Sequence, residues 1–222
     1  MHAHSRETQA SMTPAKSLAF LREGNERFMN NLRVNRNFLR QVNETKAGQF
    51  PFAVVLSCID SRTSAELIFD QGLGDIISIR VAGNVLNDDV IGSMEFACAV
   101  AGSKLILVLG HTGCGAIESA CRGIRIGRLA GIVDKVQPSL DSVRAEDPDL
   151  AEPELVAQVA HDHARRQMYE ILDRSPILHD LYAEGRIGLA AGLYSVDSGM
   201  VTFFDSLIDE EEGVSAGAHA SA

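Results

Sequence analysis

Two uninterrupted apolar segments of strand length constrain the fold of this chain more than any other feature. They are FAVVLS at residues 52–57 and LILVL at residues 105–109. A strand with one face in water alternates polar and apolar residues, whereas a strand covered on both faces is apolar throughout, as in parallel sheets. Helical patterns separate these segments. The sequence therefore predicts an α/β fold with a mainly parallel central β-sheet flanked by helices.

Several further elements fit this architecture. The expected strands are at residues 76–81, 187–194 and 200–204, and the expected helices are at residues 64–69, 87–100 and 153–173, with one more starting near Cys114. The sequence Asp197-Ser198-Gly199 is typical of a tight turn between the last two strands.

The region before the first strand predicts an N-terminal helical arm at residues 13–47. Thr13 and Pro14 are typical of an N-cap and a first helical position. An apolar stripe follows at helical spacing, and it consists of Leu18, Leu21, Phe28 and Leu32. A second helix is expected at residues 38–46, before Gly48. Such an amphipathic arm can pack on its own chain or on a partner.

The 222 residues suffice for one sizeable domain, and no internal repeat or linker divides them. We expect residues 13–208 to form this single domain. Residues 1–12 are polar and are expected to be a flexible leader. Residues 209–222 combine an acidic run with small residues and are expected to be a mobile tail.

Charge and hydropathy restrict the partners and the location. The formal net charge of −10 disfavours binding to nucleic acid and to anionic membranes. No apolar run approaches the ~20 residues needed to span a bilayer, and the first residues lack the apolar core of a secretory signal. A soluble, cytoplasmic protein is expected. In that reducing compartment, four cysteines indicate metal binding or catalysis rather than a disulfide scaffold.

Three residues with metal-binding side chains follow the two buried strands. Cys58 comes after the first, and His111 and Cys114 come after the second. The carboxyl ends of parallel strands meet at one edge of a sheet, where ligands bind. Two thiolates and an imidazole suit Zn²⁺ and leave its fourth position open. Taken alone, a buried cysteine is more often a small core residue, so the neighbouring residues carry the argument.

These neighbours favour a chemical role. Asp60 and Arg62 place a carboxylate and a guanidinium beside Cys58, where they can form a bidentate pair. Gly110, Gly113 and Gly115 flank the other two candidate ligands, as expected where backbone approaches a ligand closely. These glycines do not form a phosphate-binding loop, because the Gly-Lys-Ser/Thr ending is missing.

The other cysteines and two histidines are interpreted as structural. Cys98 and Cys121 lie in helical stretches without a partner motif and are expected in or near the core. His161 and His163 are two residues apart on a helix, so they point to different faces and make a poor metal pair. We expect them to be solvated or to cap a helix.

The motifs Cys58-x-Asp60-x-Arg62 and His111-x-x-Cys114 together resemble the zinc signature of the β-class carbonic anhydrases. The resemblance continues through residues 68–84 and 105–116 and covers roughly residues 14–205. It implies that Cys58, His111 and Cys114 bind zinc, with water or hydroxide in the fourth position. It also implies that Asp60 accepts a hydrogen bond from that hydroxide, and that Arg62 holds Asp60.

The same resemblance suggests a substrate pocket. Gln49 matches the amide that orients substrate in family members with an open zinc site. Ile77 and Ala82 fall where the family lines an apolar CO₂ pocket, but the plant enzymes carry Phe and Val there. Phe96 stands where those enzymes have Tyr. Gly115, where backbone can approach a ligand, is grouped with these residues.

The implied function is the reversible hydration of CO₂ to bicarbonate and a proton, by a carbonate dehydratase (a lyase) with one Zn²⁺ per chain. The family's active sites lie at subunit interfaces, so a homodimer or a dimer of dimers is expected. The motifs leave two alternatives open: a hydrolase of COS or CS₂ on the same zinc scaffold, and a zinc-binding protein without catalysis. No proton-shuttle residue is identified.

Overall fold

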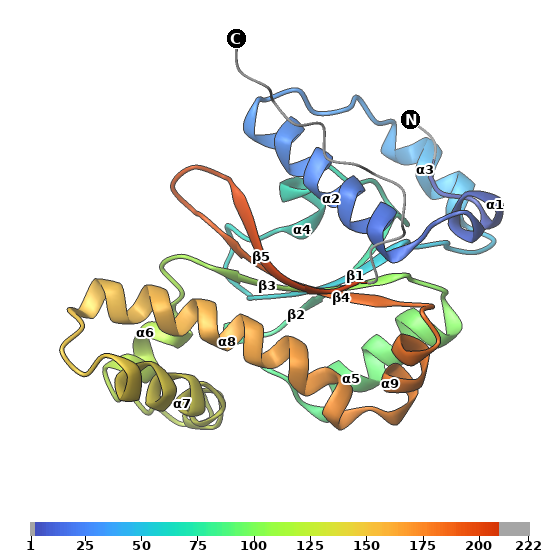
Figure 1. Cartoon of the computed structure of the whole chain (residues 1–222). Helices are drawn as coiled ribbons and strands as arrows, with labels where there is room; N and C mark the ends of the chain where they lie inside the picture. The colour runs from blue at the N-terminus through green and yellow to red at the C-terminus, as the bar shows by residue number, and fades with distance from the viewer. Residues whose placement is uncertain (1–2, 209–222) are drawn as a thin grey trace, which may run out of the picture.

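One five-stranded sheet forms the centre of the computed structural model, which describes residues 3–208 (Figure 1). The strand order is β2-β1-β3-β4-β5. The strands are β1 (Ala53–Ser57), β2 (Ile76–Arg80), β3 (Leu105–His111), β4 (Gly188–Tyr194) and β5 (Val201–Leu207). The first four are parallel to one another, and only β5 runs antiparallel to its neighbour β4. The predicted mainly parallel sheet is confirmed.

Helices cover both faces of this sheet (Figure 1). On one face lie α1 (Arg6–Ala10), α2 (Pro14–Met29), α3 (Phe38–Thr45) and α4 (Ala65–Ile68). On the other lie α5 (Asp88–Glu95), α6 (Gly115–Cys121), α7 (Leu129–Glu146), α8 (Glu152–Arg174) and α9 (Pro176–Ala183). Two short helical turns, η1 (Ala82–Asn84) and η2 (Phe96–Val100), follow β2 and α5.

The two apolar segments become the most buried strands, as their composition predicts. Every residue of β1 and β3 is buried. Because successive strand side chains point to opposite faces, Val54 and Leu56 join one apolar cluster and Val55 joins the other. Both faces therefore need apolar residues, which explains the absence of polar alternation.

The predicted helix starts are confirmed at two positions. The Thr13 side chain accepts a hydrogen bond from the Lys16 amide, with Pro14 in the first turn. Asn87 caps α5 by accepting from the Val90 amide at 2.8 Å. Helices α7 and α9 were not expected.

The segment expected to be a flexible leader differs from that expectation within its described residues. It contains α1, and the Gln9 side chain donates hydrogen bonds to the carbonyls of Pro51 and Ala101, each at 2.7 Å. Met12 is buried. The expected tail at residues 209–222 lies outside the described residues. Among residues 3–208, no helix has both the length and the apolar character to cross a membrane.

A buried ionic cluster ties the N-terminal arm to the domain. Asp70, which follows α4 and has a φ of 46°, accepts a hydrogen bond from Arg27 Nε at 2.6 Å and pairs with Arg36. The Val34 amide also donates to it at 3.2 Å. Burial raises the pKa of Asp70, but the hydrogen bonds from Arg27 and Arg36 outweigh burial and hold that pKa below its ordinary value.

Replacing Asp70 with asparagine should destabilise the protein. Asp70→Asn keeps the size and tolerates the positive φ, but it leaves the Arg36 side chain, only 4% exposed, without its carboxylate. We expect a loss of about 3 kcal/mol in the free energy of unfolding at pH 7. The lowered pKa means that this contribution is fully present above the unfolded pKa of about 3.9 and is lost as pH falls below that value and through the lower pKa of the folded state.

Denaturant unfolding at several pH values measures this effect. The difference between wild type and Asp70→Asn should shrink as the pH falls below about 4. Glu184→Gln is the matched control, because Glu184 pairs with Arg186 at the exposed surface, and it should change stability by no more than about 0.5 kcal/mol. Equal effects of the two substitutions would contradict the role given to Asp70.

Candidate metal centre

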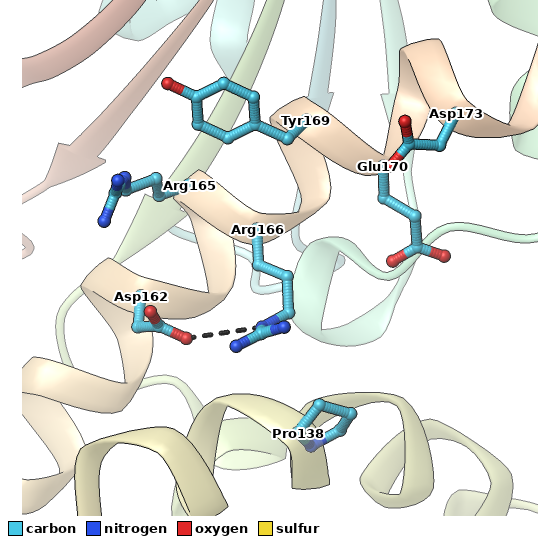
Figure 2. A pocket seen from close by; sticks show the side chains of 7 residues that line it. All are labelled: Pro138, Asp162, Arg165, Arg166, Tyr169, Glu170 and Asp173. Carbon is cyan, nitrogen blue, oxygen red and sulfur yellow. Dashed lines mark ion pairs between the residues drawn. The ribbon is translucent and has the colours of Figure 1, made fainter. Parts of the chain in front are cut away.

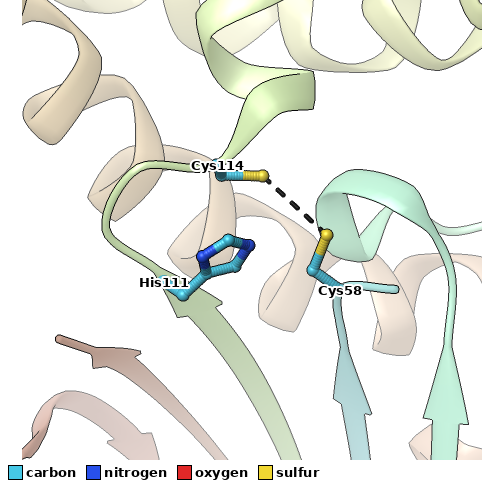
Figure 3. A group of neighbouring side chains, drawn as sticks. All are labelled: Cys58, His111 and Cys114. Carbon is cyan, nitrogen blue, oxygen red and sulfur yellow. Dashed lines mark hydrogen bonds between the residues drawn. The ribbon is translucent and has the colours of Figure 1, made fainter. Parts of the chain in front are cut away.

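The three candidate ligands converge at the carboxyl ends of β1 and β3 (Figure 3). Cys58 directly follows β1, His111 ends β3, and Cys114 is the N-cap residue of α6. Ser57 of β1 is paired with Leu109 of β3, so the strands place their ends side by side. All three residues are buried, and their ligand atoms lie within 4.8 Å of one another.

This geometry fits a tetrahedral zinc ion. Two thiolates at about 2.3 Å from such an ion are separated by about 3.8 Å, and the Sγ atoms of Cys58 and Cys114 are 3.9 Å apart. His111 Nδ1 donates to the Thr112 carbonyl at 2.9 Å, which leaves Nε2 with a free lone pair. Nε2 is buried and has no hydrogen-bond partner within residues 3–208, as expected of a metal ligand.

The two thiols are electrostatically inequivalent. The hydrogen bond with Cys114 is the main cause that lowers the pKa of Cys58, and hydrogen bonds from backbone amides add to it. The same hydrogen bond, together with burial, raises the pKa of Cys114. The two thiols together therefore release one proton readily and retain the other. A metal ion would displace that second proton on binding.

Hydrogen bonds from one backbone amide and two side chains hold Cys58 in place. The Gly83 amide points to the Cys58 Sγ at 3.4 Å, and Thr63 Oγ1 donates to the Cys58 carbonyl at 3.0 Å. Arg80 Nε donates to the same carbonyl at 3.0 Å, and Arg80 Nη2 donates to the Asp60 carbonyl at 2.6 Å. Arg80 and Gly83 were not among the predicted site residues. Two signals were available: their place at or just after the end of a predicted strand, and their position within residues 68–84, where the resemblance to the family continues.

Asp60 and Arg62 form the bidentate pair that their spacing predicts. Arg62 Nε donates to Asp60 Oδ1 at 2.9 Å, and Nη2 donates to Oδ2 at 2.7 Å. The Arg62 amide adds a third hydrogen bond at 2.9 Å. These bonds hold the pKa of Asp60 far below its usual range, although burial opposes them. Asp60 is therefore ionised, and it does not belong to the group of possible metal ligands.

The predicted substrate residues fall in two places. Gln49, Ile77 and Phe96 line one pocket of about 610 Å³, together with residues of α5. Ala82 and Gly115 do not line this pocket. Ala82 is half-buried in η1, and Gly115 is exposed at the start of α6. None of the three metal-ligand candidates lines it either.

A second hollow, of about 450 Å³, lies between α7 and α8 (Figure 2). Its lining is mostly charged and includes an ion pair between Asp162 and Arg166 at 3.5 Å. It contains no predicted site residue. Its side chains are Pro138, Asp162, Arg165, Arg166, Tyr169, Glu170 and Asp173.

Cys98, Cys121, His161 and His163 were interpreted as structural residues. The expected environment is confirmed for both cysteines and wrong for His163. Cys98 is buried and Cys121 is half-buried, as expected. His161 is exposed and stacks on Phe204. His163, expected to be solvated or to cap a helix, is instead fully buried. The physical reason is that α8 packs against both the sheet and α7, so the side of the helix that carries His163 never meets solvent.

Comparisons with known proteins show which family this chain resembles. A model of the family described as "Carbonic anhydrase" matches residues 53–201. "Carbonic anhydrase 2" of Mycobacterium tuberculosis is 34% identical over 202 residues, covering 87% of this chain and 94% of that protein. A "Carbonic anhydrase" of Mycolicibacterium smegmatis is 40% identical over 134 residues, covering 57% of this chain and 65% of that protein.

Solved structures share the fold. The β-carbonic anhydrase CafA of Aspergillus fumigatus superposes with a TM-score of 0.70 at 23% identity, covering 89% of this chain and 93% of that one. The Coccomyxa β-carbonic anhydrase, solved in complex with acetazolamide, gives a TM-score of 0.69 at 22% identity, covering 74% and 77%.

Loss of one ligand should remove the metal. We expect about one zinc ion per chain in the purified wild type. Cys58→Ser and His111→Ala should each abolish stoichiometric zinc binding, because a site with three protein ligands cannot spare one. Cys98→Ser is the control: Cys98 is equally buried but lies in the core among apolar residues. The zinc content of each protein is measured by atomic absorption. Full occupancy in the Cys58→Ser and His111→Ala variants would refute the ligand assignment.

Proposed function

This chain belongs to the β-carbonic anhydrase family, and from that premise we propose which of its residues carry out the reaction. It is a zinc-dependent carbonate dehydratase, which hydrates CO₂ reversibly to bicarbonate and a proton. The observation that carries this assignment is the convergence of Cys58, His111 and Cys114 beside an oriented carboxylate. The matched relatives are named carbonic anhydrases, so neither of the two alternatives is favoured.

In our proposal, zinc is held by Cys58 Sγ, Cys114 Sγ and His111 Nε2. When bound, it supplies the nucleophile by lowering the pKa of a coordinated water from 15.7 towards ~7. Two thiolates reduce the positive charge of the metal, so we expect this pKa to be higher than it would be with three neutral imidazoles. The three side chains are buried, which keeps competing water away from the ligand atoms.

We assign to Asp60 the task of accepting a hydrogen bond from the attacking oxygen, so that a lone pair of that oxygen points at the CO₂ carbon. An ionised carboxylate is an acceptor only, and the low pKa of Asp60 keeps it ionised. Arg62 holds both carboxylate oxygens. This bidentate contact keeps Asp60 off the metal and fixes its direction. We therefore propose that a bound zinc ion would keep its fourth position free for water.

We further propose a homodimer or a dimer of dimers in which each site is completed by a second copy. Gln49, Ile77 and Phe96 line a pocket that includes none of the metal ligands, and this separation supports a site in which the metal centre of one copy is completed by residues of another. Helix α3 supports the proposal, because Leu39 is 78% exposed and Val42 51% exposed. Exposed apolar patches of this kind are typical of interfaces.

Two broader assignments complete the proposal. Residues 13–208 are proposed to form one catalytic domain, and the matched region 53–201 lies inside it. The cytoplasm is the proposed location, because the three-ligand site needs both cysteines as reduced thiolates.

The substitution Asp60→Asn should separate metal binding from catalysis. Asparagine keeps the shape but loses the charge, and its amide can present a donor where an acceptor is needed. We expect zinc content near wild type and a kcat/KM lower by roughly 10²-fold or more. Stopped-flow CO₂ hydration with parallel zinc analysis measures both. Asp180→Asn, at an exposed surface position of α9, is the control and should change neither. Hydration within about twofold of wild type would show that Asp60 has no such role.

The oligomeric state should depend on the apolar face of α3. Replacing Leu39 and Val42 with glutamate places charges in the proposed interface, and we expect light scattering to show a shift from dimer or tetramer towards monomer, with loss of CO₂ hydration. The matched control is Ile177→Glu, which adds a charge at an exposed apolar position of α9. A wild-type protein that is monomeric and fully active at micromolar concentration would defeat the proposal.

A further inference from the structure

A histidine outside the metal centre is buried in the middle of α8. His163 has no exposed surface, and its Nε2 lies 2.9 Å from the Gly83 carbonyl oxygen. Because a carbonyl only accepts, Nε2 carries the proton and donates it. Burial lowers the pKa of His163 to about 4, so the ring is neutral near pH 7. Its Nδ1 has no hydrogen-bond partner among the described residues. The bond to Gly83 is thus the only polar contact recorded for this side chain there.

Gly83 connects this histidine to a metal ligand. Its amide points to Cys58 Sγ at 3.4 Å, while its carbonyl accepts from His163. Its φ of 65° lies in the left-handed region, where glycine is favoured. The peptide that contains the Gly83 carbonyl is also held on its other side, because the Asn84 amide donates to the Val81 carbonyl at 2.9 Å. The orientation of this short turn decides where the Gly83 amide points.

A second residue of α8, one helical turn after His163, also contacts this segment. Gln167 Oε1 accepts a hydrogen bond from the Leu86 amide at 2.7 Å, and Gln167 is also buried. From α7, Lys135 Nζ donates to the Leu86 carbonyl at 2.6 Å. The segment between Gly83 and Leu86 is therefore fixed at both ends by polar side chains from the helical layer. Apolar packing alone would not specify the direction of its amides.

We propose that His163 is a positioning residue for the metal centre, acting through Gly83 to orient the N–H···S hydrogen bond to Cys58. The proposal rests on the assignment of Cys58 as a zinc ligand. A hydrogen bond to a thiolate fixes the direction of its lone pairs and reduces its charge donation to the metal. Outer groups that orient metal ligands typically contribute about 10–100-fold in metal affinity or activity.

Two polar variants of nearly equal size separate this role from a merely structural one. In His163→Gln, the amide nitrogen reaches about as far as the imidazole Nε2 and can still donate to Gly83. In His163→Asn, the amide is shorter and reaches only about as far as Nδ1. Met168→Ala is the control, because Met168 is also fully buried on α8 but packs in an apolar cluster. It should lower thermal stability without touching the Gly83 turn.

The first measurement is zinc affinity by chelator competition. We expect His163→Asn to bind zinc about 10–100-fold more weakly than wild type, and His163→Gln and Met168→Ala to stay within about threefold. Equal affinity in the Asn and Gln variants, or an equal loss in Met168→Ala, would overturn the proposal. A wild type without zinc affinity would instead refute the ligand assignment of Cys58 itself, so the two failures are distinguishable.

The second measurement does not depend on the folding of the Asn variant. In wild-type protein loaded with ¹¹³Cd²⁺, NMR should detect a coupling between the metal and the Gly83 amide proton across the hydrogen bond to sulfur. The coupling should persist in His163→Gln. Its absence in the folded, cadmium-loaded wild type, or its loss in a folded His163→Gln protein, would overturn the proposal.

Discussion

The parallel pairing of β1 with β3 is the constraint on which the rest of the structure depends. It brings Cys58, which follows β1, next to His111, which ends β3, although 53 positions separate them in the sequence. Parallel neighbours need a crossover connection, and helices in such connections bury both faces of the sheet. The apolar composition of the two strands, the helical layers and the metal centre at the strand ends are therefore consequences of one topology.

At this edge of the sheet, the candidate metal ligands and the Asp60–Arg62 ion pair lie in two different environments. The ligand atoms of Cys58, His111 and Cys114 are buried, where the two thiols share a hydrogen bond and titrate unequally. Asp60 and Arg62 lie nearer to solvent, where their charges are held by each other. The buried part is suited to hold an ion, and the outer part to orient a reacting group. In our proposal, the bidentate contact with Arg62 keeps the Asp60 carboxylate from binding the metal.

Local patterns in the sequence predict most of the fold and the centre of the site. The β1 and β3 strands, the cap at Thr13 and the pairing of Asp60 with Arg62 each follow from a short motif with a physical reason. Helix α7 was missed because Gly131 and Pro138 interrupt its sequence, yet it forms through the burial of a stripe. The members of this stripe are Val133, Val136, Leu140 and Val143.

The remaining misses concern contacts between distant segments. Helical spacing shows that His161 and His163 face different ways, but it does not show which of them meets the turn at Gly83, 80 residues earlier. Gln9 looks like part of a polar leader until Pro51 and Ala101 supply carbonyl acceptors for it. Such partners depend on the packing of the whole domain and carry no signal in the local sequence.

The central claim is that this chain hydrates CO₂ with a zinc ion held at the ends of β1 and β3. The most direct test is stopped-flow CO₂ hydration by the purified wild-type protein before zinc removal, after removal, and after stepwise return of zinc. The account predicts that activity disappears with the metal and returns in proportion to bound zinc, saturating at about one ion per chain. Full activity in the metal-free protein, or none in the protein reloaded with one zinc per chain, would contradict it.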